Sequence, residues 1–392
     1  MKKEEIISIV DKHYLPVFGR YDVVLDFGKN AELYDIDGKR YLDFFAGIAV
    51  SILGHNNPAL TQAISEQAAK LIHCTNLFYT EIQAKTVEKL TQLSGFQRVF
   101  FSNSGTESIE GAIKLARKYG KKNGGKYKII SASNSFHGRT LGALAATGQT
   151  KYQKDFEPVI DGFEYAEFND CADLKNKFDD KTCAVLLEPI QGEGGIIPAD
   201  KEFLQTAAEL CEKNNALLIF DEIQTGLFRT GKTFCFQHFE IKPDIMVLAK
   251  ALGGGFPIGA ILCNEKTASA IDKGDHGSTF GGGPLACAAA FCVLSKAQDL
   301  SLDRNSEKIG AYIMEKLNEL KKDFLFIKEV RGKGLLIGVE LTKEGGPIVK
   351  KALEKGLIIN CTASKVLRIC PPLIIGKKEA DEMIKILKEA LI

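Results

Sequence analysis

Residues 244–260 read DIMVLAKALGGGFPIGA. In this stretch an apolar run ends on Lys250, and a cluster of glycines follows at once. A charged amine that is buried without a partner is costly, so it either finds an acid or gives up its proton. The stretch therefore predicts a buried strand that carries Lys250 to the interior. There the amine is either paired with an acid or used chemically in its neutral form.

Similar short apolar runs recur between about residues 60 and 290, where they alternate with segments of helical periodicity. Strands that are apolar on both faces are typical of a mostly parallel sheet covered by helices on both sides. The pattern predicts an α/β layer fold with its functional groups at the carboxyl ends of the strands. The expected strands are RVFF (98–101), KYKIIS (126–131), CAVLLE (183–188), ALLIFD (216–221) and DIMVLA (244–249), and ESIEGAIKLARKYG (107–120) is the clearest expected helix.

Both ends of the chain follow a different pattern. The stretch NAELYDIDGKRYLDF (30–44) predicts a hairpin, because an Asp-Gly turn separates two strand-like runs. The C-terminal part mixes helical segments with short strands. We therefore expect a large domain from residues 61–290 and a smaller α/β domain that residues 1–60 and 291–392 build together. The expected C-terminal strands are LLIGVEL (335–341) and VLRIC (366–370).

The composition excludes several classes of protein. The chain has 392 residues, of which 45% are hydrophobic and 26% charged, and its formal net charge is +1. This balance favours a folded protein with a large core, and it gives no field that would attract nucleic acid or an anionic membrane. The 10 cysteines are scattered, with no CxxC pair and no Cys/His spacing of a metal site. With no signal-peptide pattern and no apolar run of about 18 residues, we expect a cytoplasmic protein without disulfides, metal or membrane span.

Three motifs stand where chemistry is expected. The run ALLIFDEIQTG ends its strand on Asp221, which in a parallel sheet would lie near Lys250. On these two residues alone, a buried ion pair and a catalytic pair both stay open. The motif SNSGT (102–106) opens a helix with small hydroxyl residues and a glycine, which is either an ordinary N-cap or a cup for an anion. The motif GSTFGGGPLA (277–286) is a second turn of this kind.

A lysine, an acid and an anion cup together point to pyridoxal phosphate. The neutral amine of a desolvated lysine can form an imine with the cofactor aldehyde and can later move protons between carbons. An acid on the pyridine nitrogen keeps that nitrogen protonated, so the ring withdraws electrons. These features predict a pyridoxal-phosphate enzyme with Lys250 and Asp221 as its central residues.

Almost the whole chain resembles the class III, or ornithine-type, aminotransferases of PLP fold type I. The resemblance rests on ordered motifs: SNSGTESIEGAIKLAR, SFHGRTLGAL, EPIQGEGGI, LLIFDEIQTGLFRTGK, KPDIMVLAKALGGGFPIGA, STFGGGPLACAAA and RGKGLLIGVEL. It implies amino-acid and keto-acid substrates and a homodimer whose active sites are shared across the interface. Within the family, the motifs LDFFAGIAVSILGHNNPAL, TNLFYT and GLIINCTASKVLRICPPL are similar to those of one branch. The reaction that this resemblance implies moves the ω-amino group of N2-acetyl-L-ornithine to 2-oxoglutarate. The products would be N-acetyl-L-glutamate 5-semialdehyde and L-glutamate, as in arginine biosynthesis.

The same resemblance implies a role for each of several residues. Lys250 would hold the cofactor aldehyde, and Asp221 would pair with the pyridine nitrogen. Arg139 would bind a substrate carboxylate. Arg368 would bind the α-carboxylate of glutamate, and Glu193 would mask Arg368 until glutamate arrives. The other implied contacts are Gln224 with the phenolic oxygen of the ring, Phe136 and Ile223 with its two faces, Ser104, Gly105 and Thr106 with the phosphate, Thr279 with the phosphate of the partner subunit, and Ser278 with the substrate.

Other interpretations stay open at this stage. Succinylornithine, N-succinyl-diaminopimelate, ornithine and 4-aminobutyrate are alternative donors. The segment GLFRTGKT (226–233) fits the Walker A pattern of a P-loop ATPase. Such a loop should follow a strand directly and open a helix, whereas DEIQT intervenes here and poor helical periodicity follows. His137 is assigned a structural part, and Tyr21, where the N-terminal match is loose, is assigned none.

Overall fold

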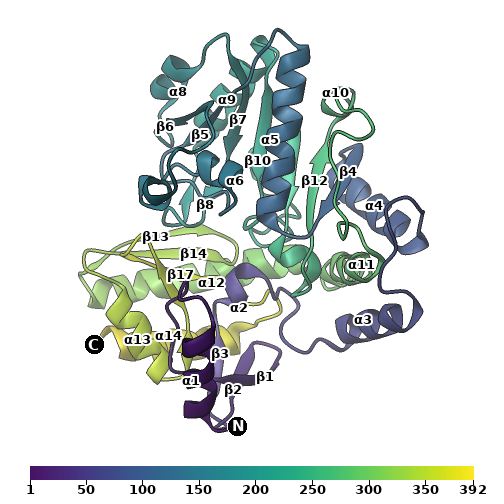
Figure 1. Ribbon diagram of the computed structural model, residues 1–392. Helices are drawn as coiled ribbons and strands as arrows, with labels where there is room; N and C mark the ends of the chain where they lie inside the picture. Colours follow the sequence, from purple (N-terminus) through teal and green to yellow (C-terminus); the bar gives the residue numbers. More distant parts are fainter.

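The computed structural model describes all residues 1–392, and its centre is a seven-stranded sheet with the strand order β4-β12-β11-β10-β7-β5-β6 (Figure 1). Strand β12 runs antiparallel to both of its neighbours, and the other pairs in the sheet are parallel. The predicted mostly parallel sheet is therefore confirmed. Its strands are β4 (Arg98–Ser102), β12 (Gly259–Cys263), β11 (Ile245–Leu248), β10 (Leu217–Asp221), β7 (Thr182–Leu187), β5 (Lys128–Ala132) and β6 (Phe163–Ala166).

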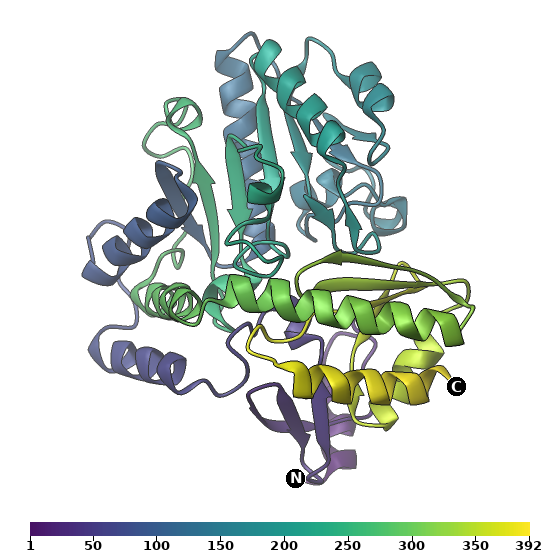
Figure 2. The same cartoon turned by 180° about the vertical axis from the view of Figure 1, so that it is seen from behind.

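Alternate side chains of the central strands enter two separate hydrophobic layers. On β11, Ile245 and Val247 belong to the layer that contains the apolar face of α5 (Gly105–Lys122), whereas Met246 and Leu248 belong to the layer that contains α9 (Lys201–Lys213). Successive side chains of a strand point to opposite faces, so a strand without polar positions needs a helical cover on both sides. Figures 1 and 2 show α5 and α9 on opposite faces of the sheet.

A second sheet joins the two ends of the chain. The predicted hairpin is present as β2 (Glu32–Asp35) and β3 (Arg40–Asp43), and β15 (Leu357–Ile358) adds to it in parallel with β3. A third sheet has the order β13-β14-β17-β16 and packs against α12 (Leu302–Asp323). Its strands are β13 (Ile327–Lys333), β14 (Leu336–Leu341), β17 (Val366–Ile369) and β16 (Asn360–Thr362). Both termini lie on the side of these smaller sheets (Figures 1 and 2). The domain limits stay a prediction, and the one near residue 290 falls inside α11 (Pro284–Asp299).

The remaining elements are short strands, helices and 3-10 turns around these sheets. Strand β1 (Leu25–Lys29) pairs with β2 at the edge of the second sheet, and β8 (Ile190–Gln191) and β9 (Ile197–Pro198) form a two-stranded sheet. The helices are α1 (Lys3–His13), α2 (Ala46–Ala49), α3 (Pro58–Lys70), α4 (Glu81–Ser94), α6 (Leu141–Ala146), α7 (Thr150–Gln153), α8 (Cys171–Lys177), α10 (Glu265–Ala268), α13 (Gly346–Glu354) and α14 (Lys377–Leu391), with 3-10 turns η1 (Lys154–Phe156), η2 (Cys235–His238) and η3 (Lys250–Gly253).

The segment 226–233 does not have the geometry of a P-loop. Leu227 and Phe228 adopt left-handed φ angles of 57° and 69°. Arg229 is buried, and its guanidinium donates to two backbone carbonyl oxygens of the C-terminal part of the chain. Only the short 3-10 turn η2 follows, so no helix N-terminus is available to hold phosphates. The P-loop alternative is wrong.

The helices, the metal-ligating side chains and the cysteines concern membrane spans, metal sites and disulfides, respectively. No single helix combines the length and the hydropathy needed to cross a membrane, and α11 and α12 pass that test only as a pair bent by 64°. No group of three or more His, Cys, Asp and Glu side chains is arranged to hold a metal ion. All of the cysteines are free thiols.

Candidate active site

A cavity of about 410 Å³ opens at the carboxyl ends of β10 and β11. Its walls come from segments that are distant in the sequence: the start of α5, the loop before α6, the loops after β7 and β10, and the residues that follow β11. This arrangement follows from a parallel sheet, in which the carboxyl ends of neighbouring strands meet at one edge. Of the residues predicted from the sequence, the cavity gathers Ser104, Gly105, Thr106, Phe136, Arg139, Glu193, Asp221, Ile223, Gln224 and Lys250.

Lys250 follows β11 in a left-handed conformation with a φ of 41°, which is strained for a lysine. Its amine makes neither an ion pair nor a hydrogen bond with any residue of the chain, so the alternative of an Asp221–Lys250 ion pair is wrong. Burial lowers the pKa of Lys250, and the positive charge of Arg368 lowers it further, against the opposing pull of nearby acids such as Glu193. The amine is therefore held toward its neutral, nucleophilic form.

Asp221 ends β10 and pairs in register with Val247 of β11, so its carboxylate and the Lys250 segment lie at the same edge of the sheet. Its Oδ2 lies 2.8 Å from Nδ1 of His137, and its Oδ1 accepts a hydrogen bond of 3.0 Å from the backbone N–H of Ile223. Because a carboxylate can only accept, Nδ1 of His137 carries the hydrogen in this contact. The two hydrogen bonds fix the orientation of the carboxylate at the cavity.

Two titratable residues of the cavity were not selected from the sequence. His137 was assigned a structural part, yet its ring contacts Asp221 and its Nε2 is buried without a partner. Glu188 directly follows β7, as Asp221 ends β10, and that shared position was a signal that could have identified it. Burial raises the pKa of Glu188 to about 7, although its oxygens accept backbone hydrogen bonds of 3.0 Å from Phe136 and Gly192. The titratable side chains of His137, Glu188 and Asp221 thus lie together in the lining of the cavity.

The anion cup lies at the first turn of α5. Ser104 is the N-cap, and its hydroxyl accepts a hydrogen bond of 3.3 Å from the N–H of Glu107. The N–H groups of Gly105 and Thr106 begin the helix and have no acceptor within it. Gly105 also allows a close approach, because a Cβ at this position would lie 2.9 Å from Ile223. The segment is therefore both an ordinary N-cap and an available anion site.

Arg368 and Glu193 form the closest ion pair of the site, with 2.5 Å between Nη1 and Oε1. The same guanidinium donates to Oδ1 of Asn360 at 3.0 Å and to Oε1 of Gln224 at 3.2 Å. Burial would raise the pKa of Glu193, but the charge and the hydrogen bond of Arg368 hold it below its usual value. The hydroxyl of Thr362 donates to the backbone carbonyl of Glu193 at 2.5 Å, which fixes the loop that carries the acid.

Arg139 lines the cavity but is exposed, and no acid is paired with it. Its guanidinium lies over two aromatic rings, 4.0 Å from the centroid of Tyr152 and 5.6 Å from that of Phe136. The cavity is therefore lined by one arginine that is free, Arg139, whereas Arg368 lies behind the lining residue Glu193, which covers it.

Ser278 and Thr279 lie outside the cavity of their own chain. The hydroxyl of Ser278 accepts a hydrogen bond of 3.1 Å from Asn103, which lines the cavity. Thr279 is exposed and lines a separate hollow with its neighbour Phe280. Within one chain, the structure therefore does not bring these two residues to the other site residues.

Comparisons with known proteins agree with this geometry. Residues 18–391 match the family model described as aminotransferase class-III. The acetylornithine aminotransferase of Methanocaldococcus jannaschii is 51% identical over 391 residues, which are 99% of this chain and 98% of the relative. That of Caldanaerobacter subterraneus subsp. tengcongensis is 50% identical over 389 residues, 98% of this chain and 99% of the relative.

Solved structures of aminotransferases share the fold of this chain. The ornithine aminotransferase of Toxoplasma gondii ME49 has a TM-score of 0.96 at 34% identity, covering 100% of this chain and 95% of that chain. The acetylornithine aminotransferase of Elizabethkingia anophelis has a TM-score of 0.89 at 34% identity, covering 100% and 99%.

The unpaired lysine and the oriented acid at the edge of this sheet define an enzyme that uses pyridoxal 5'-phosphate. The family match over residues 18–391 then places the chain among the class-III aminotransferases, to which it belongs. The expected fold, enzyme class and cofactor are therefore confirmed.

Proposed function

We propose that this enzyme moves the ω-amino group of N2-acetyl-L-ornithine to 2-oxoglutarate and forms N-acetyl-L-glutamate 5-semialdehyde and L-glutamate. The observation that carries the proposal is the covered cation Arg368, 2.5 Å from Glu193, in one site with the uncovered Arg139. Relatives at 51% and 50% identity that are named acetylornithine aminotransferase support the choice of donor. Ornithine is the second candidate, because an ornithine aminotransferase shares the fold at 34% identity.

The residues at the cavity fit pyridoxal phosphate. When bound, the cofactor supplies an aldehyde for the amines and a ring that withdraws electrons from the reacting carbon. Asp221 would hold the pyridine nitrogen, and Gln224 the phenolic oxygen. In the remaining contacts, Ser104, Gly105 and Thr106 would hold the phosphate, and Phe136 and Ile223 would pack on the ring.

Lys250 would hold the cofactor and would also act as the proton carrier. A lysine Nζ that is free of ion pairs and has a lowered pKa can accept a proton from one carbon and deliver it to another. The hydrogen bonds that Asp221 receives from His137 and Ile223 would keep its carboxylate aimed at the ring.

In the two half-reactions, different arginines would bind the carboxylate that fixes the orientation of the substrate. The donor reacts through its ω-amine, so its only carboxylate is remote from the reacting carbon and would bind Arg139. Glutamate reacts through its α-amine, so its α-carboxylate lies close to that carbon and would bind Arg368. During the donor half-reaction Glu193 covers Arg368, and a substrate carboxylate can replace it because both present oxygen pairs to the guanidinium.

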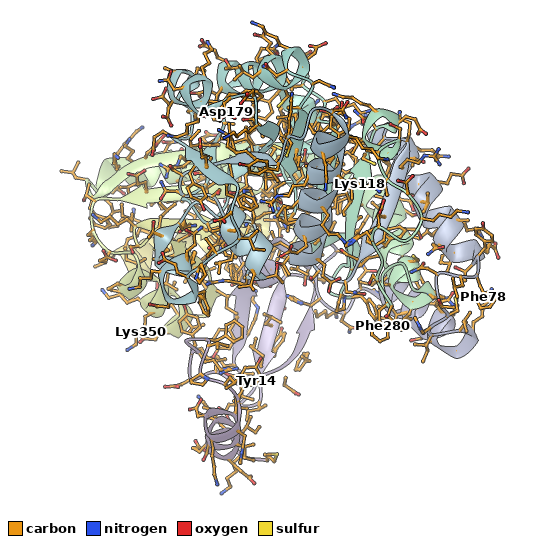
Figure 3. The ribbon with its side chains drawn as sticks, turned by 45° about the horizontal axis from the view of Figure 1, so that its top comes forward. Tyr14, Phe78, Lys118, Asp179, Phe280 and Lys350 are labelled. Atoms are coloured by element: carbon orange, nitrogen blue, oxygen red, sulfur yellow. The ribbon has the colours of Figure 1, made fainter.

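A homodimer would complete the site. Large apolar side chains are exposed beside the loop of Ser278 and Thr279: Phe280 is 65% exposed, and Phe78 is 67% exposed. Figure 3 shows Phe78 and Phe280 on the same side of the molecule. Asn76 ties the two segments together by a hydrogen bond of 2.8 Å to the carbonyl of Gly281. A second subunit would cover this surface and receive Thr279 at its phosphate site.

The cellular setting and the domain limits belong to the same proposal. Free thiols throughout the chain support a reducing compartment, the cytoplasm. The sharing of one sheet by β3 and β15 supports a small domain that residues 1–60 and 291–392 build beside a large domain of residues 61–290.

Initial rates with a panel of ω-amino donors test the proposal. The panel contains N2-acetylornithine, succinylornithine, N-succinyl-diaminopimelate, ornithine and 4-aminobutyrate, each with 2-oxoglutarate as acceptor. We expect the highest kcat/KM for N2-acetylornithine. A higher kcat/KM for any other donor would replace the proposed substrate, and no turnover with any donor would reject the reaction.

A further inference from the structure

We propose that Tyr152 is a positioning residue that holds the guanidinium of Arg139 in the orientation that receives a substrate carboxylate. This inference rests on the proposed function, in which Arg139 binds the donor carboxylate, and it extends that role to the second carboxylate of glutamate and 2-oxoglutarate, the one that Arg368 does not bind. The carbon at the centre of the guanidinium lies 4.0 Å from the centroid of the Tyr152 ring, closer than its 5.6 Å from Phe136. Tyr152 is the nearest aromatic support of this arginine.

The contact fixes Arg139 without using its hydrogen-bond donors. The guanidinium has no ion pair, and the only hydrogen bond of this residue runs from its backbone N–H to the hydroxyl of Thr106 at 3.3 Å. A cation is attracted to the face of an aromatic ring, whereas the N–H donors of arginine lie in the plane of the guanidinium. Arg368 is different, because Glu193 occupies one of its donors. A ring therefore suits a cation that must stay open to substrate.

The backbone that carries Tyr152 is itself fixed. It belongs to α7, and the next side chain, Gln153, is buried. The Gln153 amide donates to the carbonyl oxygens of Leu144 and Thr147 at 3.0 Å and 2.8 Å. The Tyr152 ring also meets Phe136 edge to face, with 6.0 Å between centroids and 81° between planes. The support is thus in place before a substrate arrives, which reduces the entropy lost on binding.

A leucine at this position tests the role. Tyr152→Leu removes the ring and keeps an apolar side chain. We expect KM to rise about two- to fivefold for both N2-acetylornithine and 2-oxoglutarate, the range that a cation–π contact supplies at an exposed arginine. The kcat should change little, since the contact acts on binding in the ground state and the transition state alike. Tyr152→Phe keeps the ring and should recover most of the loss.

The matched control is Tyr312→Leu. Tyr312 is a partly buried tyrosine of α12, with the amine of Lys377 4.7 Å from its ring centroid, and it does not line the cavity. This variant makes the same chemical change far from Arg139, so both KM values should stay as in the parent. The absorbance of the bound cofactor should be the same in all three variants.

Arg139→Ala and the double variant Arg139→Ala/Tyr152→Leu complete the cycle. If Tyr152 acts through Arg139, the double variant should bind substrates no more weakly than Arg139→Ala alone. Unchanged KM values in Tyr152→Leu, additive losses in the double variant, or loss of the cofactor absorbance would overturn the positioning role. If Arg139→Ala itself leaves both KM values unchanged, the proposed role of Arg139 fails instead.

Discussion

Replacing Glu193 by glutamine would remove the charge that covers Arg368 and change the shape of the side chain very little. The two side chains meet at 2.5 Å, and that of Arg368 is 2% exposed. A substrate α-carboxylate can reach Arg368 only after this contact has been broken. Glu193→Gln should therefore favour glutamate over the donor, because glutamate no longer has to displace an acid.

The expected size of the effect follows from the negative charge that is lost, since the amide oxygen of a glutamine could still accept a hydrogen bond from Arg368. A hydrogen bond between charged groups contributes about 1.5–3 kcal/mol. The side chain of Glu193 is 27% exposed, so solvent screening favours the low end, about 1.5 kcal/mol, which corresponds to about a tenfold change. Arg368 keeps its hydrogen bonds to Asn360 and Gln224, so we expect the variant to fold.

Single-turnover kinetics of the separate half-reactions measure this effect. The ratio of kcat/KM for glutamate to kcat/KM for N2-acetylornithine should rise about tenfold in Glu193→Gln. The control is Glu382→Gln, which breaks an ion pair of the same length, 2.5 Å to Arg40, away from the cavity. An unchanged ratio in Glu193→Gln would refute the idea that Glu193 masks Arg368.

Four further results are expected. Lys250→Ala should still bind cofactor but lose about 10²–10⁴ in turnover because the proton carrier is gone, and mass spectrometry after borohydride reduction of the parent should find the cofactor on Lys250. Asp221→Asn should slow both half-reactions by about two to three orders of magnitude, because it removes the charge that would face the protonated pyridine nitrogen. Two unit charges about 4 Å apart at an effective dielectric of ~20 interact by roughly 4 kcal/mol. Near-normal rates would show that Asp221 has only a structural role. In stopped-flow measurements, Arg368→Ala should impair the glutamate half-reaction far more than the donor half-reaction, whereas Arg139→Ala should impair both, and equal losses for Arg368→Ala would contradict this division. Arg368 lowers the pKa of Glu193 against the effect of burial, so the contribution of Glu193 to stability is present above the ordinary carboxyl pKa and is lost as the pH falls through the lowered value. The difference in Tm between Glu193→Gln and the parent should therefore shrink as the pH falls. A difference in Tm that does not change with pH would exclude this link between the protonation of Glu193 and stability.

Much of the central sheet could be predicted because its signal is local. A strand buried on both faces needs apolar side chains at every position, so a run such as DIMVLA indicates β11 without any tertiary information. The same holds for the hairpin of β2 and β3, which an Asp-Gly turn marks. Strands β6 and β12 were not predicted. The antiparallel direction of β12 could not be predicted from composition either, because the direction of a strand depends on its connection.

The candidate site could be predicted only in part. The ordered motifs of the family resemblance selected residues that the structure brings to one cavity, although their roles stay predictions. His137 and Glu188 were missed, because an isolated histidine and a strand-terminal acid are common in structural positions. The support that Tyr152 gives to Arg139 was equally invisible, since contacts between rings and cations follow no sequence spacing.

The amino-acid sequence located five of the central strands to within a few residues, because a strand buried on both faces is a continuous apolar run that local composition reveals. Which charged side chains form pairs could be seen only in the folded structure. Asp221 could pair with Lys250 or with His137, and in the fold its carboxylate contacts His137. Glu193 and Arg368 are 175 residues apart in the chain and touch because β17 of the C-terminal sheet lies against the turn between β8 and β9. A charge takes its partner from the folded surroundings that bury it, and those surroundings exist only once distant strands have been packed together.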